Sequence, residues 1–87
     1  KYPYILRAWF PAENLDQLRQ KYIEFSKILG IKDEKPTIEI ATTYVKEWLA
    51  KHPGWLIVYD NVENYKDIEH FLPEDGGHVI LTTRNRN

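Results

Sequence analysis

The sequence predicts a small α/β domain in which a sheet of parallel strands is covered by helices. Two observations lead to this fold class. Strand-like segments alternate with helix-like segments, and two of the strand-like segments are almost entirely apolar. Alternation of this kind indicates parallel strands joined by right-handed crossovers. A continuous apolar strand is typical of one covered on both faces. The predicted order is strand, helix, helix, strand, helix, strand.

The first part of the chain is predicted to form a strand and an amphipathic helix. Residues 4–10, YILRAWF, are aromatic and β-branched without an internal glycine, and Pro11 closes this strand. The helix that follows has Asn14 as its N-cap, Gln17 as the partner in a capping-box pattern and Gly30 as its left-handed stop. Its apolar stripe recurs every three or four residues and consists of Leu15, Leu18, Tyr22, Phe25 and Leu29.

A second helix is predicted to begin after its N-cap, Thr37, and to end before the pair Pro53-Gly54. Two of its acids, Glu39 and Glu47, belong to a charged helix face, which is expected to point at water. The apolar face of this helix comprises Ile38, Ala41, Val45, Trp48 and Leu49.

The last part of the chain is predicted to form two buried strands with a short helix between them. Residues 55–60, WLIVYD, are almost continuously apolar, and residues 78–85, HVILTTRN, repeat this pattern. Residues 64–72 are predicted to form the helix, which packs with Tyr65, Ile68, Phe71 and Leu72 and is followed by helix-breaking proline and glycine residues. Core or near-core aromatic anchors are expected at Trp9, Trp48 and Trp55.

Composition and charge exclude several classes of protein. A formal net charge of −1 argues against a nucleic-acid binder, and no apolar run approaches the roughly 18 residues that a membrane span needs. The chain has no cysteine, which excludes disulfides and thiolate metal sites and is consistent with a cytoplasmic, reducing compartment. It has no methionine and begins at Lys1, so we expect a processed product or a piece of a larger protein.

Two polar pairs follow the two buried strands, namely Asp60-Asn61 and Thr83-Arg84. Because ligands of open parallel sheets lie outside the carboxyl ends of the strands, both pairs are expected at one ligand-binding edge. A carboxylate there suits Mg²⁺, which prefers oxygen ligands and bridges substrate phosphates, and a guanidinium suits a terminal phosphate. Thr82 and Thr83 offer hydroxyls nearby. The same residues also admit a simpler interpretation, with Asp60-Asn61 as a turn or helix-cap pair and Arg84 as a surface cation.

The segment GWLIVYDNVENYKDIEHFLPEDGGHVILTTRN resembles the Walker B to sensor-1 region of NB-ARC ATPases, which belong to the STAND class of signalling P-loop NTPases. That family pattern is a hydrophobic strand ending in Asp, a short helix ending in Leu-Pro, a glycine-containing turn and a strand reading roughly Val-Ile-Leu-Thr-Thr-Arg. The earlier segment YILRAWFPAENLDQLRQKYIEFSKILGI is similar to the strand and helix that follow the nucleotide-binding helix of the family. The resemblance covers nearly the whole chain and implies a partial P-loop NTPase fold.

The resemblance also implies roles for single residues. Asp60 matches the Walker B acid that holds Mg²⁺ through water, and Arg84 matches the sensor arginine that contacts the terminal phosphate of ATP, with Thr83 beside it. Asn61 stands where many relatives carry a second acid, and because an amide cannot take a proton from water, fast hydrolysis is not expected. The phosphate-binding loop G-x-x-x-x-G-K-[ST] is absent from the sequence. Residues 1–87 are therefore expected to be a partial NB-ARC-like domain of an ATP/ADP-binding switch, inactive on their own.

The implied partners are the nucleotide and the other domains of the parent protein. In the family a further strand pairs beside the last strand of this chain, so the edge between His78 and Thr83 is expected to be open and to invite self-association. One alternative belongs to another class, a nucleotide-independent α/β interaction module whose strand-end residues serve as caps. A phospho-receiver domain with Asp60 as acceptor is disfavoured, because it needs a pair of acids after an earlier strand, where this chain supplies only Glu13.

Overall fold

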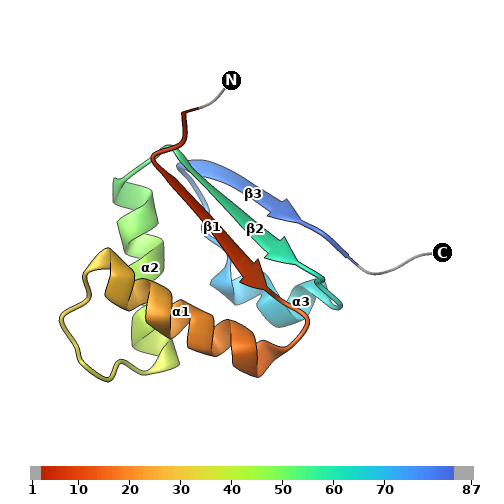
Figure 1. Cartoon of the computed structure of the whole chain (residues 1–87), viewed down its shortest axis with the longest axis horizontal. Coiled ribbons are helices and arrows are strands. Elements are labelled where there is room, and N and C mark those ends of the chain that lie inside the picture. Colours follow the sequence, from red (N-terminus) through yellow and green to blue (C-terminus); the bar gives the residue numbers. More distant parts are fainter. Residues whose placement is uncertain (1–2, 84–87) are drawn as a thin grey trace.

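The computed structural model describes residues 3–83 and contains a three-stranded parallel sheet. Strands β1 (Leu6–Pro11), β2 (Trp55–Asp60) and β3 (Gly77–Leu81) lie side by side in the order β1-β2-β3 and point the same way (Figure 1). The α/β fold class, the parallel sheet and the order of strands and helices are therefore confirmed. The first strand differs slightly from its prediction, because it begins at Leu6 and includes Pro11. Proline is tolerated there since β1 is an edge strand.

Helix α1 (Leu15–Leu29) follows β1 and has the caps that the sequence predicts. The side-chain oxygen of Asn14 accepts a hydrogen bond from the backbone N–H of Gln17 at 3.1 Å. This bond satisfies one of the N–H groups that have no partner within the first turn of a helix. At the other end Gly30 has a φ of 111°, and its N–H donates back to the carbonyls of the last turn. That backbone conformation favours glycine.

Helix α2 (Ile38–Lys51) also begins where its predicted N-cap places it. The hydroxyl oxygen of Thr37 accepts from the backbone N–H of Ile40 at 3.2 Å. The helix ends at His52, whose backbone N–H donates to the carbonyl of Trp48 at 3.0 Å. The apolar face packs as predicted, with Ala41, Val45 and Leu49 fully buried.

The connection between β2 and β3 is shorter and tighter than the predicted helix. Helix α3 (Tyr65–Ile68) forms about one turn and continues as a 3₁₀ turn, η1 (Glu69–Phe71). Of the side chains predicted to pack, Ile68 and Phe71 are fully buried, whereas Tyr65 is exposed. None of the helices formed by residues 3–83 is long and apolar enough to cross a membrane.

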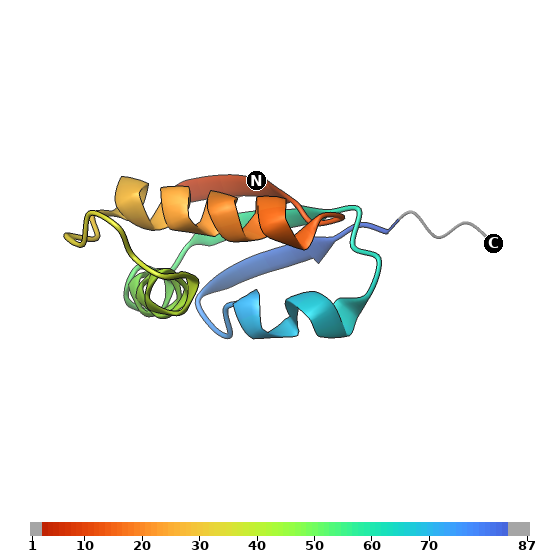
Figure 2. The same ribbon diagram turned by 90° about the horizontal axis from the view of Figure 1, so that it is seen from below.

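All of the helices cover the same face of the sheet. Helices α2 and α3 lie below the strands in Figure 2, with α1 in front of them, and one hydrophobic cluster joins α1, α2 and η1 to the three core-facing side chains of β2. Those side chains are Trp55, Ile57 and Tyr59. The strands follow each other across the sheet in the same order as along the chain, β1-β2-β3. Two right-handed crossovers between such strands place their helices on the same face of the sheet. The expectation that β2 and β3 are buried strands covered on both faces is therefore wrong for the described part of the chain. Strand β3 is largely exposed, and it ends at Leu81 rather than at residue 85.

The other face, called the uncovered face below, carries a row of apolar side chains across all three strands. The strand register pairs Trp9 with Val58 and Val58 with Ile80, and these three residues form the central row. Trp9 is 59% exposed and Ile80 is 47% exposed. The prediction of Trp9 as a core anchor is therefore wrong. Side chains alternate along a strand, and in β1 it is Ala8 and Phe10 that turn toward the core.

Tyr4 lies across the amino-terminal end of the uncovered face. Its hydroxyl forms a hydrogen bond with Nδ1 of His78 at 2.8 Å, and the two rings meet edge to face. The guanidinium of Arg7 lies 5.9 Å from the centre of the Tyr4 ring, within the range of a cation–π contact. The register places Leu56 between Arg7 and His78, so Tyr4 closes over the row of side chains at this end.

A short series of hydrogen bonds crosses the core. The hydroxyl of Tyr22 donates to the backbone carbonyl of Phe71 at 2.7 Å. Because that bond uses the proton of Tyr22, the hydroxyl of Tyr59, 2.6 Å away, donates to the oxygen of Tyr22. The ring of Phe10 packs between both tyrosines, with ring centres 5.0 and 5.5 Å away. Burial raises the pKa of both tyrosines, so both stay neutral at ordinary pH.

Trp55 fixes the start of β2 against α2 and β3. Its indole N–H donates to the carbonyl of Leu49 at 3.0 Å, which satisfies the polar group of a ring that is only 1% exposed. A methyl group at Gly77 would collide with the Trp55 ring and with its carbonyl, so this position requires glycine for lack of space. The predicted anchors Trp55 and Trp48 are confirmed, the second as a half-buried side chain packed against the core.

Candidate strand-end site

Asp60 lies at the carboxyl end of the central strand, on the uncovered face. It is the last residue of β2, and because Tyr59 turns into the core, the side chain of Asp60 turns to the opposite side. Its Oδ1 accepts a hydrogen bond from the hydroxyl of Thr82, just after the end of β3. Asp60 is half-buried. Its carboxylate is therefore held in one orientation while remaining accessible from solvent.

The residue after Asp60 has an unusual backbone conformation. Asn61 has a φ of 63°, in the left-handed region where non-glycine residues are uncommon and asparagine is among the better tolerated. This turn directs the backbone N–H of Asn61 to the hydroxyl oxygen of Thr82, at 2.9 Å. The Thr82 hydroxyl thus accepts from the backbone N–H of Asn61 and donates to Asp60, so its proton points toward the carboxylate.

Backbone hydrogen bonds extend the sheet into this region. The N–H of Thr82 donates to the carbonyl of Tyr59 at 3.0 Å, and the N–H of Val62 donates to the carbonyl of Thr82 at 2.8 Å. On the β1 side, the N–H of Ala12 donates to the carbonyl of Asp60 at 2.7 Å. Both neighbours of β2 therefore hold its carboxyl end, and the side chains there stand on a rigid backbone.

A second carboxylate reaches the same edge from the loop between β1 and α1. Oε1 of Glu13 accepts a hydrogen bond from the side-chain N–H of Asn61 at 3.0 Å. Glu13 was not among the residues predicted for this edge of the sheet. The signal was nevertheless present, since Glu13 follows the end of β1 by two residues and parallel strands end at one edge. We call Glu13, Asp60, Asn61 and Thr82 the strand-end site.

The structure brings some of the predicted site residues together. Asp60 and Asn61 lie at the expected edge. Of the two threonines named as nearby hydroxyls, Thr82 contacts the Asp60 carboxylate, because the register pairs Tyr59 with Leu81 and so sets Asp60 opposite the next residue of the chain. Thr83 is exposed. The predicted phosphate-binding residue Arg84 lies outside the described residues.

The donor set of the strand-end site suits a hard cation with few protein ligands. Within residues 3–83, no group of three or more His, Cys, Asp or Glu side chains could enclose a metal ion. Mg²⁺ ordinarily needs only one or two carboxylates, because waters and substrate phosphates complete its octahedral shell. Asp60 and Glu13 are carboxylates of the type that such an ion accepts.

Comparison of the chain with models of protein families, with curated proteins and with solved structures finds no match in any of the three. The resemblance to the NB-ARC family stays a prediction.

Proposed function

We propose that this chain is part of a STAND-class, NB-ARC-like switch that binds ATP or ADP with Mg²⁺ at the strand-end site. The observation that carries the proposal is the hydrogen bond that holds Asp60 at the carboxyl edge of a parallel sheet, on the uncovered face. In open parallel α/β sheets this edge is where ligands bind. A carboxylate oriented there is the group that a magnesium-bound nucleotide requires.

The proposal gives each residue of the edge a role. Asp60 would hold Mg²⁺ through water, and the ion would neutralise phosphate charge when bound. As the resemblance implies, Arg84 would contact the terminal phosphate, with Thr83 beside it. Thr82 positions the Asp60 carboxylate, and Asn61 stands at the place of an activating acid without being able to accept a proton. Slow turnover follows, which suits a switch that rests in one nucleotide state.

The uncovered face supports the idea that the parent domain is larger. All-parallel sheets normally have both faces covered, yet the central row of Trp9, Val58 and Ile80 is half-buried at most. In the family, the phosphate-binding loop leads into a helix. A helix packed on the central row would bury these side chains and bring its phosphate-binding N-terminus toward Asp60. For the chain alone, the open edge of β3 between His78 and Thr83 provides a route to self-association.

The experiment that tests the proposal compares two variants of the parent protein. Asp60→Ala removes the proposed magnesium ligand, and Asp67→Ala removes an exposed carboxylate of α3 as a matched control. Isothermal titration with ATP, with and without Mg²⁺, measures the magnesium-dependent part of the affinity. We expect that part to be lost in the first variant and retained in the second. For the 87-residue chain alone we expect no tight binding and no ATPase activity.

A second candidate function is a nucleotide-independent interaction module, and the exposed central row is the observation that favours it. Contiguous apolar surface on a small domain often marks a protein-binding site. On this interpretation Asp60 and Asn61 only close the turn after β2. Substitution by Asp60→Asn, which retains a hydrogen-bond acceptor for Thr82, would then leave every activity of the parent protein unchanged. The nucleotide proposal predicts loss of magnesium-dependent binding in the same variant.

A further inference from the structure

Glu13 stands on a loop that is anchored to the end of the central strand. It follows β1 by two residues and precedes Asn14, the N-cap of α1. Its neighbour Ala12 is 4% exposed, and the backbone N–H of Ala12 donates to the carbonyl of Asp60 at 2.7 Å. Glu13 itself is exposed. Its carboxylate is therefore accessible at the same edge as Asp60, while its backbone is held in place.

Hydrogen bonds of Asn61 join this carboxylate to the rest of the strand-end site. The side-chain N–H of Asn61 donates to Oε1 of Glu13 at 3.0 Å. The backbone N–H of Asn61 donates to the hydroxyl of Thr82 at 2.9 Å, and that hydroxyl donates to Oδ1 of Asp60. One connected series of hydrogen bonds therefore orients the carboxylates of Glu13 and Asp60, which stand at the ends of two neighbouring strands.

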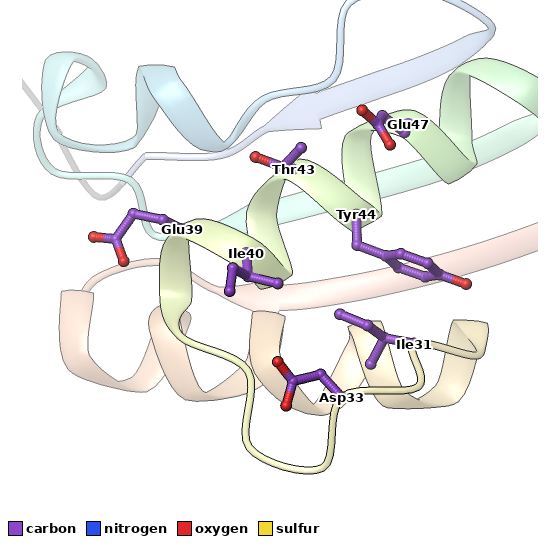
Figure 3. Close-up of a pocket in the computed structure, with 7 residues that line it drawn as sticks. All are labelled: Ile31, Asp33, Glu39, Ile40, Thr43, Tyr44 and Glu47. Carbon is purple, nitrogen blue, oxygen red and sulfur yellow. The ribbon is translucent and has the colours of Figure 1, made fainter.

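Other acids of the chain are placed differently. Asp33, Glu39 and Glu47 line a shallow pocket of about 420 Å³ between α2 and the loop that connects it to α1 (Figure 3). Glu63 follows β2 closely in the sequence, but it is exposed in the segment that leads to α3. The strand-end site thus takes its second carboxylate from the loop after β1.

The amide of Asn61 allows two carboxylates to share this edge. An aspartate at position 61 has no N–H to donate to Glu13, and two ionised carboxylates at hydrogen-bond distance repel each other. An amide donates to the Glu13 carboxylate and leaves its negative charge in place. The carboxylate that many members of the resembling family carry at position 61 is absent from this chain, and that of Glu13 lies 3.0 Å from the amide nitrogen.

We propose that Glu13 is the carboxylate that activates water for ATP hydrolysis in the parent protein and that Asn61 is its positioning residue. This inference rests on the proposed nucleotide function. In the reaction, the oxygen of a water forms a bond to the terminal phosphorus of ATP, and the bond from that phosphorus to its bridging oxygen breaks, so that ADP leaves with the electron pair. One proton of the water passes to Glu13 and then to solvent, and the other remains on the phosphate. A carboxylate can accept this proton, whereas the Asn61 amide cannot.

A mutant cycle in the 87-residue chain tests the contact without nucleotide. Glu13→Gln keeps a carbonyl oxygen that accepts from Asn61, so the urea midpoint of unfolding should stay nearly unchanged. Asn61→Asp removes the donor and should lower that midpoint. Combining the two substitutions lets the new amide donate to the new carboxylate and should recover part of the loss. If Glu13→Gln shifts the midpoint equally with and without Asn61→Asp, the contact is absent and the proposal is overturned.

Single-turnover hydrolysis and ATP affinity of the parent protein test the role of Glu13. Glu13→Gln should slow hydrolysis at least about a hundredfold, the usual contribution of a general base, while the magnesium-dependent ATP affinity stays within about twofold. The control Glu63→Gln removes an exposed carboxylate that follows β2 and should leave both quantities unchanged. Adding Asn61→Asp to Glu13→Gln should restore part of the rate, because a carboxylate returns to this edge.

Failure of this inference is distinguishable from failure of the proposed function. Retained magnesium-dependent ATP binding with equal hydrolysis rates in Glu13→Gln and the unsubstituted protein, or with no hydrolysis by either, overturns the assignment of Glu13 alone. Absence of ATP binding that depends on Mg²⁺ and on Asp60 overturns the proposed function and this inference with it.

Discussion

The hydroxyl of Thr82 donates a hydrogen bond to the carboxylate of Asp60, 22 residues earlier in the chain, and so joins the ends of β3 and β2. The same hydroxyl accepts from the backbone N–H of Asn61 at 2.9 Å. Thr82 is therefore a positioning residue for both members of the Asp-Asn pair. Its side chain holds the turn after β2. It also fixes the orientation of the Asp60 carboxylate and so the direction in which Oδ2 points.

Replacement of Thr82 by valine should destabilise the chain. Valine has the same shape but neither donates to Asp60 nor accepts from Asn61, so two hydrogen bonds are lost. We expect the free energy of unfolding in urea to fall by about 1–3 kcal/mol. The matched control is Thr83→Val at the neighbouring exposed position, which should change stability by less than about 0.5 kcal/mol. Equal effects of the two substitutions would show that the Thr82 hydroxyl has no special role.

Replacement of Asn61 tests the left-handed turn. Alanine at a φ of 63° carries the steric cost of the left-handed region, whereas glycine has no such cost. Both substitutions remove the side-chain bond to Glu13, so their difference reports the backbone alone. We expect Asn61→Ala to be less stable than Asn61→Gly by about 1 kcal/mol, measured as a difference in urea unfolding. A stability of Asn61→Ala equal to or above that of Asn61→Gly would contradict this backbone conformation.

Alkaline pH should destabilise the fold through the buried tyrosine pair. Burial raises the pKa of Tyr22 and Tyr59 above the ordinary value of 10.0. Between pH 10 and the folded pKa values, the unfolded chain loses tyrosine protons that the folded chain retains, so the free energy of unfolding falls as pH rises. Each tyrosine contributes about 1.4 kcal/mol per pH unit to this slope.

The variant Tyr59→Phe isolates one of these two contributions. Above pH 10, its free energy of unfolding should fall less steeply than that of the unsubstituted chain, by about 1.4 kcal/mol per pH unit. Below pH 10 the two slopes should coincide, because tyrosine is then protonated in the folded and the unfolded chain. Urea unfolding between pH 8 and pH 12 measures both slopes. Parallel curves above pH 10 would refute a raised pKa at Tyr59.

The exposed apolar surface of β3 should make the chain associate with itself at high concentration. Ile80 is 47% exposed on the edge strand, and Ile80→Lys places a charge on that surface. We expect the variant to sediment as a smaller species than the unsubstituted chain at equal concentration. Ile28→Lys changes a 77% exposed isoleucine on α1 and serves as the control. If both variants reduce association equally, the strand edge is not its cause.

Local signals in the sequence were sufficient for the order of strands and helices and for the caps of α1 and α2. Helices α1 and α2 begin after Asn14 and Thr37, and α1 ends at Gly30, because short-range chemistry decides caps. Local signals could not predict which side chains of β1 face the core. An aromatic strand offers large apolar side chains on both sides, and only packing against the helices decides that Phe10 is buried and Trp9 exposed.

Only part of the strand-end site could be predicted from the sequence. The edge position of Asp60 follows from the parallel sheet alone. The contact between Thr82 and Asp60 depends on strand register, and the contact between Glu13 and Asn61 joins residues 48 positions apart. The coverage of one face depends on strand order, which an apolar pattern in β2 does not encode. These features arise from tertiary pairing rather than from local preference.

The most direct test of the nucleotide proposal is the affinity of the parent protein for ATP in the presence and absence of Mg²⁺, with Asp60 intact and with Asp60→Ala. We predict that Mg²⁺ strengthens binding to the unsubstituted protein at least about tenfold, a difference of about 1.4 kcal/mol, and that the substitution abolishes this gain while the fold persists. An undiminished magnesium effect in Asp60→Ala would contradict the assignment of Asp60 as the magnesium-binding acid.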